Sequence, residues 1–150
     1  MITRRDAVIA VVGACATVAA VALAQTSGKT VMKSSVFEWA NIQAEPTKVG
    51  ARRQFFEAPT ATLDQLSCHV TTLNPGEAPH PGHAHPAEEL VIVKEGTIEA
   101  VQNSVTNRVG PGSIIFEASN EYHSLRNVGS TPASYYVIKW FSPGTLEQKK

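Results

Sequence analysis

Short apolar segments separated by turn residues run along the chain from residue 63 onward. The segments are rich in aliphatic and β-branched residues, and turn sequences such as Asn74-Pro75-Gly76 and Gly110-Pro111-Gly112 lie between them. β-Branched residues favour strands, whereas Gly, Pro and Asn favour turns. The pattern predicts strands at residues 66–73, 90–93, 97–102, 105–109, 113–116 and 134–141.

This succession of strands indicates an all-β fold. No helical periodicity is present after residue 25, and short strands at regular spacing are typical of a sandwich or barrel. Residues 90–93 and 114–116 are apolar at successive positions, so both faces of these strands should be covered. One face would line the interior, and the other would meet a second sheet or a partner subunit, which predicts a homodimer. Residues 51–56 are expected to form an extended edge segment.

The N-terminus has the features of an export signal. Arg4-Arg5 precedes an apolar run of small residues at 7–24, and Ala22-Leu23-Ala24 matches the small-x-small pattern of a signal-peptidase site. We expect a signal peptide at residues 1–24. Because paired arginines are typical of twin-arginine signals, we expect export of the folded protein to the periplasm or the extracellular space. The alternatives are a retained membrane anchor and a lipoprotein cleavage box at Cys15.

The rest of the chain is expected to hold a flexible linker at residues 25–35 and a single domain at 36–150. The formal net charge of +0, with 17% charged residues, gives no support to nucleic-acid binding. Cys68 is the only cysteine left after processing, so no internal disulfide is expected, and we interpret it as a small buried apolar residue. Phe37 and Trp39 are interpreted as aromatic packing against the domain or a sister subunit.

Candidate chemistry is concentrated in the segment His83-Ala84-His85-Pro86-Ala87-Glu88-Glu89. Imidazole and carboxylate groups together suit first-row transition ions such as iron, manganese, nickel or zinc. His83, His85 and Glu89 share odd parity, so an extended chain would point all three to one face, although a turn at Pro86 would break that parity. A metal site would need a further ligand from elsewhere in the chain.

Three other histidines are candidates for that ligand, His69, His80 and His123. His123 has the best context, because it follows a loop after a predicted strand and begins the apolar-polar alternation His123-Ser124-Leu125-Arg126-Asn127. His80 could act as a further ligand or proton shuttle, and a solvated loop histidine is the simpler interpretation.

Two segments together resemble the paired motifs of the cupin superfamily of small β-barrels. The first is Gly76, a spacer, His83-Ala84-His85, three residues, Glu89, six residues and Gly96. The second is Gly112, five residues, Ala118-Ser119-Asn120, two residues, His123, three residues and Asn127. The resemblance covers about residues 66–141, and all four ligand positions of the motifs are filled.

The chain departs from the family pattern at three points. Six residues separate Gly76 from His83 where five are usual, so the loop that carries His80 should differ in shape. Ala118 stands where the family has proline, and Asn120 stands where it has glycine. Because asparagine tolerates a left-handed backbone, the turn at Asn120 is expected to survive.

The resemblance implies a double-stranded β-helix, or jelly-roll barrel, that holds one divalent metal ion ligated by His83, His85, Glu89 and His123. Mn or Fe is favoured, and Ni or Zn is possible, because a protein that folds before export would meet its metal in the cytoplasm. Four protein ligands in an octahedral shell leave two positions for water or substrate.

Several further residues are candidates for contacts to the metal ligands or to a substrate. Glu88 is the alternative to Glu89, with a spacing from His85 that is one residue short. A paired arginine could hold a carboxylate or phosphate through two hydrogen bonds, although a solvated strand is the simpler interpretation. The candidates are His69, His80, Glu88, Arg52, Arg53 and Tyr122.

These features favour an exported, metal-dependent enzyme that acts on a small organic molecule, in first place an oxidoreductase of the dioxygenase type. Isomerase or lyase chemistry is one alternative. The other is a protein that uses the metal to bind a sugar or carboxylate without converting it, because one fold can host many functions. No nucleic-acid partner is expected, and the membrane would be involved only through an uncleaved export signal.

Overall fold

The computed structural model describes residues 30–145. The predicted signal peptide, residues 1–24, lies outside the described residues, as do residues 25–29 of the expected linker and residues 146–150. Within the described end of that linker, Met32 donates its backbone N–H to the carbonyl oxygen of Pro59 at 2.9 Å. This end of the expected linker is therefore hydrogen-bonded to the rest of the chain.

Nine strands and one short 3-10 helix make up the regular structure of residues 30–145. In chain order they are η1 (Trp39–Asn41), β1 (Glu45–Thr47), β2 (Gly50–Ala58), β3 (Gln65–Leu73), β4 (Glu88–Glu95), β5 (Ile98–Gln102), β6 (Val105–Val109), β7 (Ile114–Glu117), β8 (His123–Asn127) and β9 (Ala133–Phe141). Every strand predicted from the sequence pattern is present. Within residues 30–145, no helix is long and apolar enough to cross a membrane.

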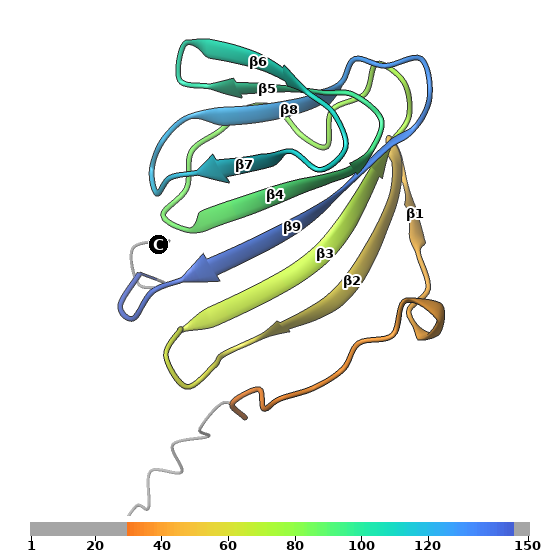
Figure 1. Cartoon of the computed structure of the whole chain (residues 1–150). Helices are drawn as coiled ribbons and strands as arrows, with labels where there is room; N and C mark the ends of the chain where they lie inside the picture. Colours follow the sequence, from red (N-terminus) through yellow and green to blue (C-terminus); the bar gives the residue numbers. More distant parts are fainter. Residues whose placement is uncertain (1–29, 146–150) are drawn as a thin grey trace, which may run out of the picture.

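The strands form two sheets that face each other (Figure 1). The larger sheet has the order β1-β2-β3-β9-β4-β7, and the smaller has the order β6-β5-β8. Neighbouring strands come from distant parts of the chain, since β3 and β4 both pair with β9 and β5 pairs with β8, all antiparallel. Such long antiparallel crossovers between two sheets are typical of a jelly roll. The predicted all-β jelly-roll fold is confirmed.

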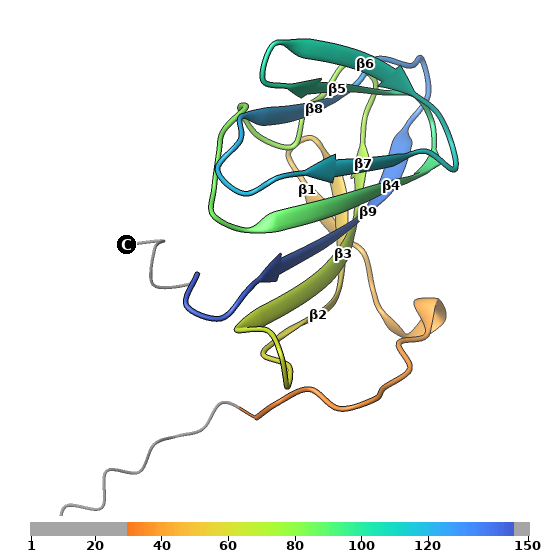
Figure 2. The same ribbon diagram turned by 60° about the vertical axis from the view of Figure 1, so that its left-hand side comes forward.

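The core lies between the two sheets, where Figure 2 shows the smaller sheet stacked over the upper strands of the larger one. On β4 and β8, buried residues alternate with less buried ones, as expected for a sheet with one buried face. On β4, Val91 and Val93 are 0% and 1% exposed, whereas Ile92 between them is only half-buried. Tyr135 on β9 and Ile98 on β5 close the core from the two sheets. Apolar side chains thus fill one part of the interior.

The outer face of β7 differs from the expectation that both faces of its strand are covered. Ile114 and Phe116 are 65% and 50% exposed, because β7 is the last strand of the larger sheet and no described segment of the chain packs over its outer face. The segment expected at the edge, residues 51–56, belongs to β2. Since β1 pairs only with residues 50–52 of β2, residues 53–56 have a partner strand on one side alone, β3, and lie at the edge of the sheet as expected.

The aromatic residues before β1 pack against β2. The ring of Phe37 lies 4.9 Å from that of Phe56, and the ring of Trp39 lies 6.1 Å from that of Phe55, measured between centroids. The guanidinium of Arg53 lies 4.1 Å from the Trp39 ring centroid, a cation–π contact. The predicted packing of Phe37 and Trp39 against the domain is confirmed.

Candidate metal centre

The loop that carries the first two histidines is fastened to the beginning of β8. His83 and His123 form an antiparallel bridge in which each backbone N–H donates to the other's carbonyl, at 3.0 and 2.9 Å. The backbone N–H of Asn120 donates to the carbonyl of His85 at 2.8 Å, and Ser119 Oγ donates to the carbonyl of Pro86 at 2.8 Å. Asn120 has a φ of 60°, the left-handed conformation expected at this position. Backbone hydrogen bonds therefore fix where these histidines lie.

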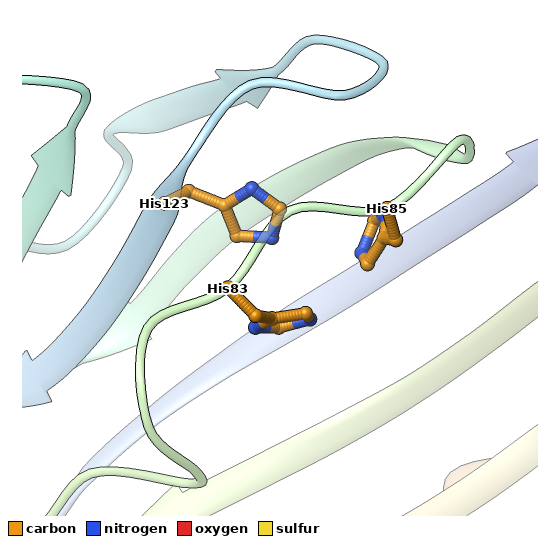
Figure 3. Close-up of side chains that lie close together, drawn as sticks. All are labelled: His83, His85 and His123. Atoms are coloured by element: carbon orange, nitrogen blue, oxygen red, sulfur yellow. The ribbon is translucent and has the colours of Figure 1, made fainter.

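The imidazoles of His83, His85 and His123 converge (Figure 3). Their ring centroids are 4.9 to 5.0 Å apart, and one ring nitrogen from each lies within 4.8 Å of those from the other two. His83 and His85 reach in from the loop before β4, and His123 from the start of β8. The structure thus brings together three of the four residues that the sequence proposes as ligands.

Hydrogen bonds to the main chain set the tautomers of two of these rings. His85 Nδ1 donates to the carbonyl of Ala87 at 3.1 Å, and His123 Nδ1 donates to the carbonyl of Glu121 at 2.9 Å. Because a carbonyl can only accept, Nδ1 carries a hydrogen in both rings, so Nε2 is the nitrogen that bears the lone pair when either ring is neutral. This is the orientation in which an imidazole serves as a metal ligand.

Two of the ring nitrogens are buried without a hydrogen-bond partner among the described residues. They are His83 Nδ1 and His123 Nε2. An unpaired buried polar atom is costly unless an unseen group satisfies it. Burial, followed by the neighbouring histidines, lowers the pKa of His83, and burial also lowers the pKa of His123. Both rings are therefore held in the neutral form that binds a cation.

Glu89 supplies a carboxylate beside these rings. It is 8% exposed on β4, and its Oε1 lies 3.0 Å from His85 Nε2 and 3.0 Å from the ammonium of Lys139 on β9. Burial alone would raise the pKa of Glu89, but hydrogen bonds from His85 and Lys139, with the positive charge of Lys139, lower it to about 2. The hydrogen bond to Glu89 raises the pKa of His85. Glu89 is therefore ionised at neutral pH.

Three imidazole nitrogens and an ionised carboxylate are a donor set that suits a first-row transition ion. The two unpaired ring nitrogens and the fixed tautomers agree with that chemistry. The residues present therefore fit a metal ion, and His83, His85, Glu89 and His123 are the residues that would hold it.

Two charged residues of the site were missed by the sequence analysis. Glu117 ends β7 directly across from Glu89 and is 3% exposed, and Lys139 pairs with Glu89 from the other side, on β9. Burial, followed by the charge of Glu89, raises the pKa of Glu117 to about 7. A signal for each existed, because Glu117 shares the parity of buried Ile115 and Lys139 interrupts an otherwise apolar strand.

A cavity of about 370 Å³ adjoins the donor cluster. Three of the proposed contact residues line it, namely His69, His80 and Arg52. The Arg52 guanidinium lies 3.3 Å from His69 Nδ1 and donates to Gln54 Oε1 at 2.7 Å. Burial, followed by the positive charge of Arg52, lowers the pKa of His69 to about 4, so this ring is neutral and accepts from Arg52. His69 thus lies on the cavity wall.

The other three proposed contact residues do not line this cavity. Arg53 donates to the carbonyl of Trp39 at 2.9 Å, on the opposite side of β2. Glu88 accepts a hydrogen bond of 2.8 Å from Trp140 Nε1, because neighbouring strand residues face opposite ways and Glu89 points inward. Tyr122 is 46% exposed, and its hydroxyl occupies the space where a side chain at Gly82 would lie.

Comparisons with known proteins bear on the fold. Residues 69–139 match the family model of the cupin domain. The cupin domain of Cnp3 from Schizosaccharomyces pombe superposes with a TM-score of 0.62 at 16% identity, over 78% of this chain and 80% of that one. The fold is a cupin barrel.

Other solved structures with a similar fold carry different names. The polyketide cyclase RemF from Streptomyces resistomycificus has a TM-score of 0.58 at 22% identity, over 75% of this chain and 82% of that one. A predicted oxalate decarboxylase from Thermotoga maritima has a TM-score of 0.57 at 18% identity, over 71% of this chain and 99% of that one. A search of curated protein sequences finds no match. These likenesses show the fold and leave the reaction open.

Proposed function

We propose that this protein is a metal-dependent enzyme that acts on a small organic molecule inside the cupin barrel. The observation that carries the proposal is the set of converging ring nitrogens from His83, His85 and His123, all within 4.8 Å of one another beside the cavity. A divalent ion held there would supply Lewis-acid or redox chemistry to a molecule in the cavity.

The proposed ligands are His83, His85, Glu89 and His123. Mn or Fe is the proposed ion, and Ni or Zn is the alternative. Carboxylate oxygen suits Mn, and a protein that folds in the cytoplasm before export meets its metal there. The proposed export is supported by the sequence of residues 1–24, which has the paired arginines and the small-x-small site.

The walls of the cavity favour a small anionic substrate. Arg52 and Lys139 place two positive side chains on the cavity, and a carboxylate or phosphate group binds to such groups through charge-assisted hydrogen bonds. Val49, Leu125 and Val137 give the same cavity an apolar wall that would contact the carbon skeleton and exclude water. A volume of about 370 Å³ is at the lower end of the range for small-molecule sites.

Dioxygenase-like oxidoreductase chemistry is the first proposal for the reaction. Isomerase or lyase chemistry is the second, because Glu117 and Lys139 lie on the cavity and are groups that can accept or donate a proton. The names of RemF and of the predicted oxalate decarboxylase also point to reactions of that second kind. A metal-dependent binding protein without turnover is the third candidate.

One purification tests these proposals together. The protein isolated from the periplasmic fraction of the expressing cell should begin at Gln25 and contain about one Mn or Fe ion per chain by elemental analysis. When small carboxylic acids are supplied, oxygen uptake that is lost in His123→Ala would support the oxidoreductase. Conversion of an acid without oxygen uptake would replace it by the isomerase or lyase. Zinc or copper as the occupant would contradict the proposed metal, and an uncleaved cytoplasmic protein would contradict export.

We also propose that the protein is a homodimer. The exposed side chains of Ile114 and Phe116, at the edge of the larger sheet, support this, because a second copy would remove them from water. Light scattering of the purified protein should give twice the mass of the chain. The Phe116→Glu variant should give the mass of a single chain. A monomer at micromolar concentration in the unchanged protein would contradict the proposal.

A further inference from the structure

His123 and Glu117 repeat the arrangement of His85 and Glu89. In each pair the histidine donates its Nδ1–H to a main-chain carbonyl two residues away, and its Nε2 faces a carboxylate oxygen. The distance from Nε2 to the carboxylate oxygen is 3.0 Å for His85 and Glu89 and 3.1 Å for His123 and Glu117. Two lone-pair atoms so close to each other repel unless a cation or a proton lies between them.

The Glu117 carboxylate is the less satisfied of the two. Glu89 Oε1 is near both His85 and Lys139. In contrast, Glu117 Oε1 is buried without a hydrogen-bond partner in the part of the chain that the structure describes. The other oxygen, Oε2, lies near His123 Nε2, but these two atoms form no hydrogen bond. A carboxylate that is 3% exposed and unpaired is costly unless something satisfies it.

The position of Glu117 explains how both carboxylates reach one point. Glu89 and Glu117 are direct partners in the antiparallel pairing of β4 and β7, so their side chains lie next to each other on the same face. One donor atom from each of Glu89, Glu117 and His123 lies within 4.8 Å of the other two. His123 is thus common to this group and to the group of three histidines.

We propose that Glu117 is a further metal ligand, so that the ion is held by three histidines and two glutamates. This rests on the metal site proposed above and changes its properties. Two carboxylates neutralise a divalent ion, and the added oxygen donor favours Mn over Zn. Five protein donors in an octahedral shell leave one position for substrate or water instead of two.

The test compares metal affinities of the full-length protein after removal of metal with a chelator. Calorimetric titration with MnCl2 and with ZnSO4 should show that Glu117→Gln weakens Mn binding at least about 10-fold and Zn binding much less, because zinc needs only four donors. Glu88→Gln is the matched control. The side chain of Glu88 faces away from Glu89 and the other proposed ligands, and it accepts a hydrogen bond from Trp140. This variant should bind both ions like the unchanged protein.

The outcomes separate this inference from the proposed function. If the unchanged protein binds Mn and Glu117→Gln binds it equally well, Glu117 is no ligand and the four-ligand site stands. Equal losses for Mn and Zn would indicate a structural role and would also overturn the inference. An unchanged protein that binds neither ion contradicts the proposed function itself.

A second measurement starts from the unchanged protein. Water-proton relaxation by Mn bound to the unchanged protein reports how many exchangeable waters the ion carries. One water is expected with five protein donors and two with four. Glu117→Ala should add one water to the count, and two waters on the unchanged protein would overturn the inference.

Discussion

Alanine in place of His83 or of His123 is expected to weaken Mn binding by at least about 100-fold, because each of several ligands contributes roughly 3 kcal/mol to a typical metal site. Each substitution removes a ring nitrogen that is buried without a hydrogen-bond partner among residues 30–145. The effect should be on the metal and not on the fold, because the bridge between these two residues uses backbone atoms that alanine keeps. Calorimetric titration with MnCl2 and melting of the metal-free variants measure the two effects.

His80→Ala is the control for this prediction. His80 is exposed, its Nδ1 donates to the carbonyl of Pro81, and its ring lies 4.4 Å from that of His83 without belonging to either donor group. Its variant should bind Mn like the unchanged protein. If His83→Ala and His123→Ala also retained that affinity, the assignment of the site would be wrong.

The sequence was sufficient for six of the nine strands within residues 30–145 and for the grouping of the histidines, because local rules determine both. Turn residues and β-branched segments mark where strands lie, and the spacing of the two motifs identified His83, His85 and His123 as one group. Even Asn120, which stands where the family motif has glycine, could be interpreted, because asparagine adopts the required φ of 60° there.

The two charged residues that were missed depend on long-range pairing. Glu117 and Lys139 reach the site only because β7 and β9 both lie beside β4 with Glu89 in register. The prediction ended β7 at Phe116, one residue before the carboxylate that points inward. No local rule gives the register between strands that are far apart in the sequence.

The two neighbouring arginines make the same point. Arg52 lines the cavity and Arg53 contacts Trp39, although the sequence of β2 alternates too little to assign either face. The register of β2 against β3 also shifts between Gln54 and Phe56. Such a bulge changes which residues face inward and is not visible in the sequence.

Asn127→Ala is expected to destabilise the protein by about 4 kcal/mol, because it leaves three backbone groups without their partner. The side chain of Asn127 is 0% exposed and donates through Nδ2 to the carbonyls of Leu73 and Thr131, at 3.0 and 2.9 Å. Its Oδ1 accepts from the backbone N–H of Gly129 at 2.9 Å. These bonds join the end of β8 to the end of β3 and to the loop before β9, and so explain the asparagine of the second motif.

Urea unfolding of the metal-free protein measures this effect, and Asn107→Ala is the matched control. Asn107 lies exposed on β6, where its side chain makes no hydrogen bond with any described residue, so its loss should change the free energy of unfolding by less than about 0.5 kcal/mol. Because Asn127 also ends the strand that begins with His123, its variant should bind Mn more weakly through a displaced β8. Equal stability of the two variants would contradict the role given to Asn127, since the loss of its three hydrogen bonds to the backbone would then have no cost.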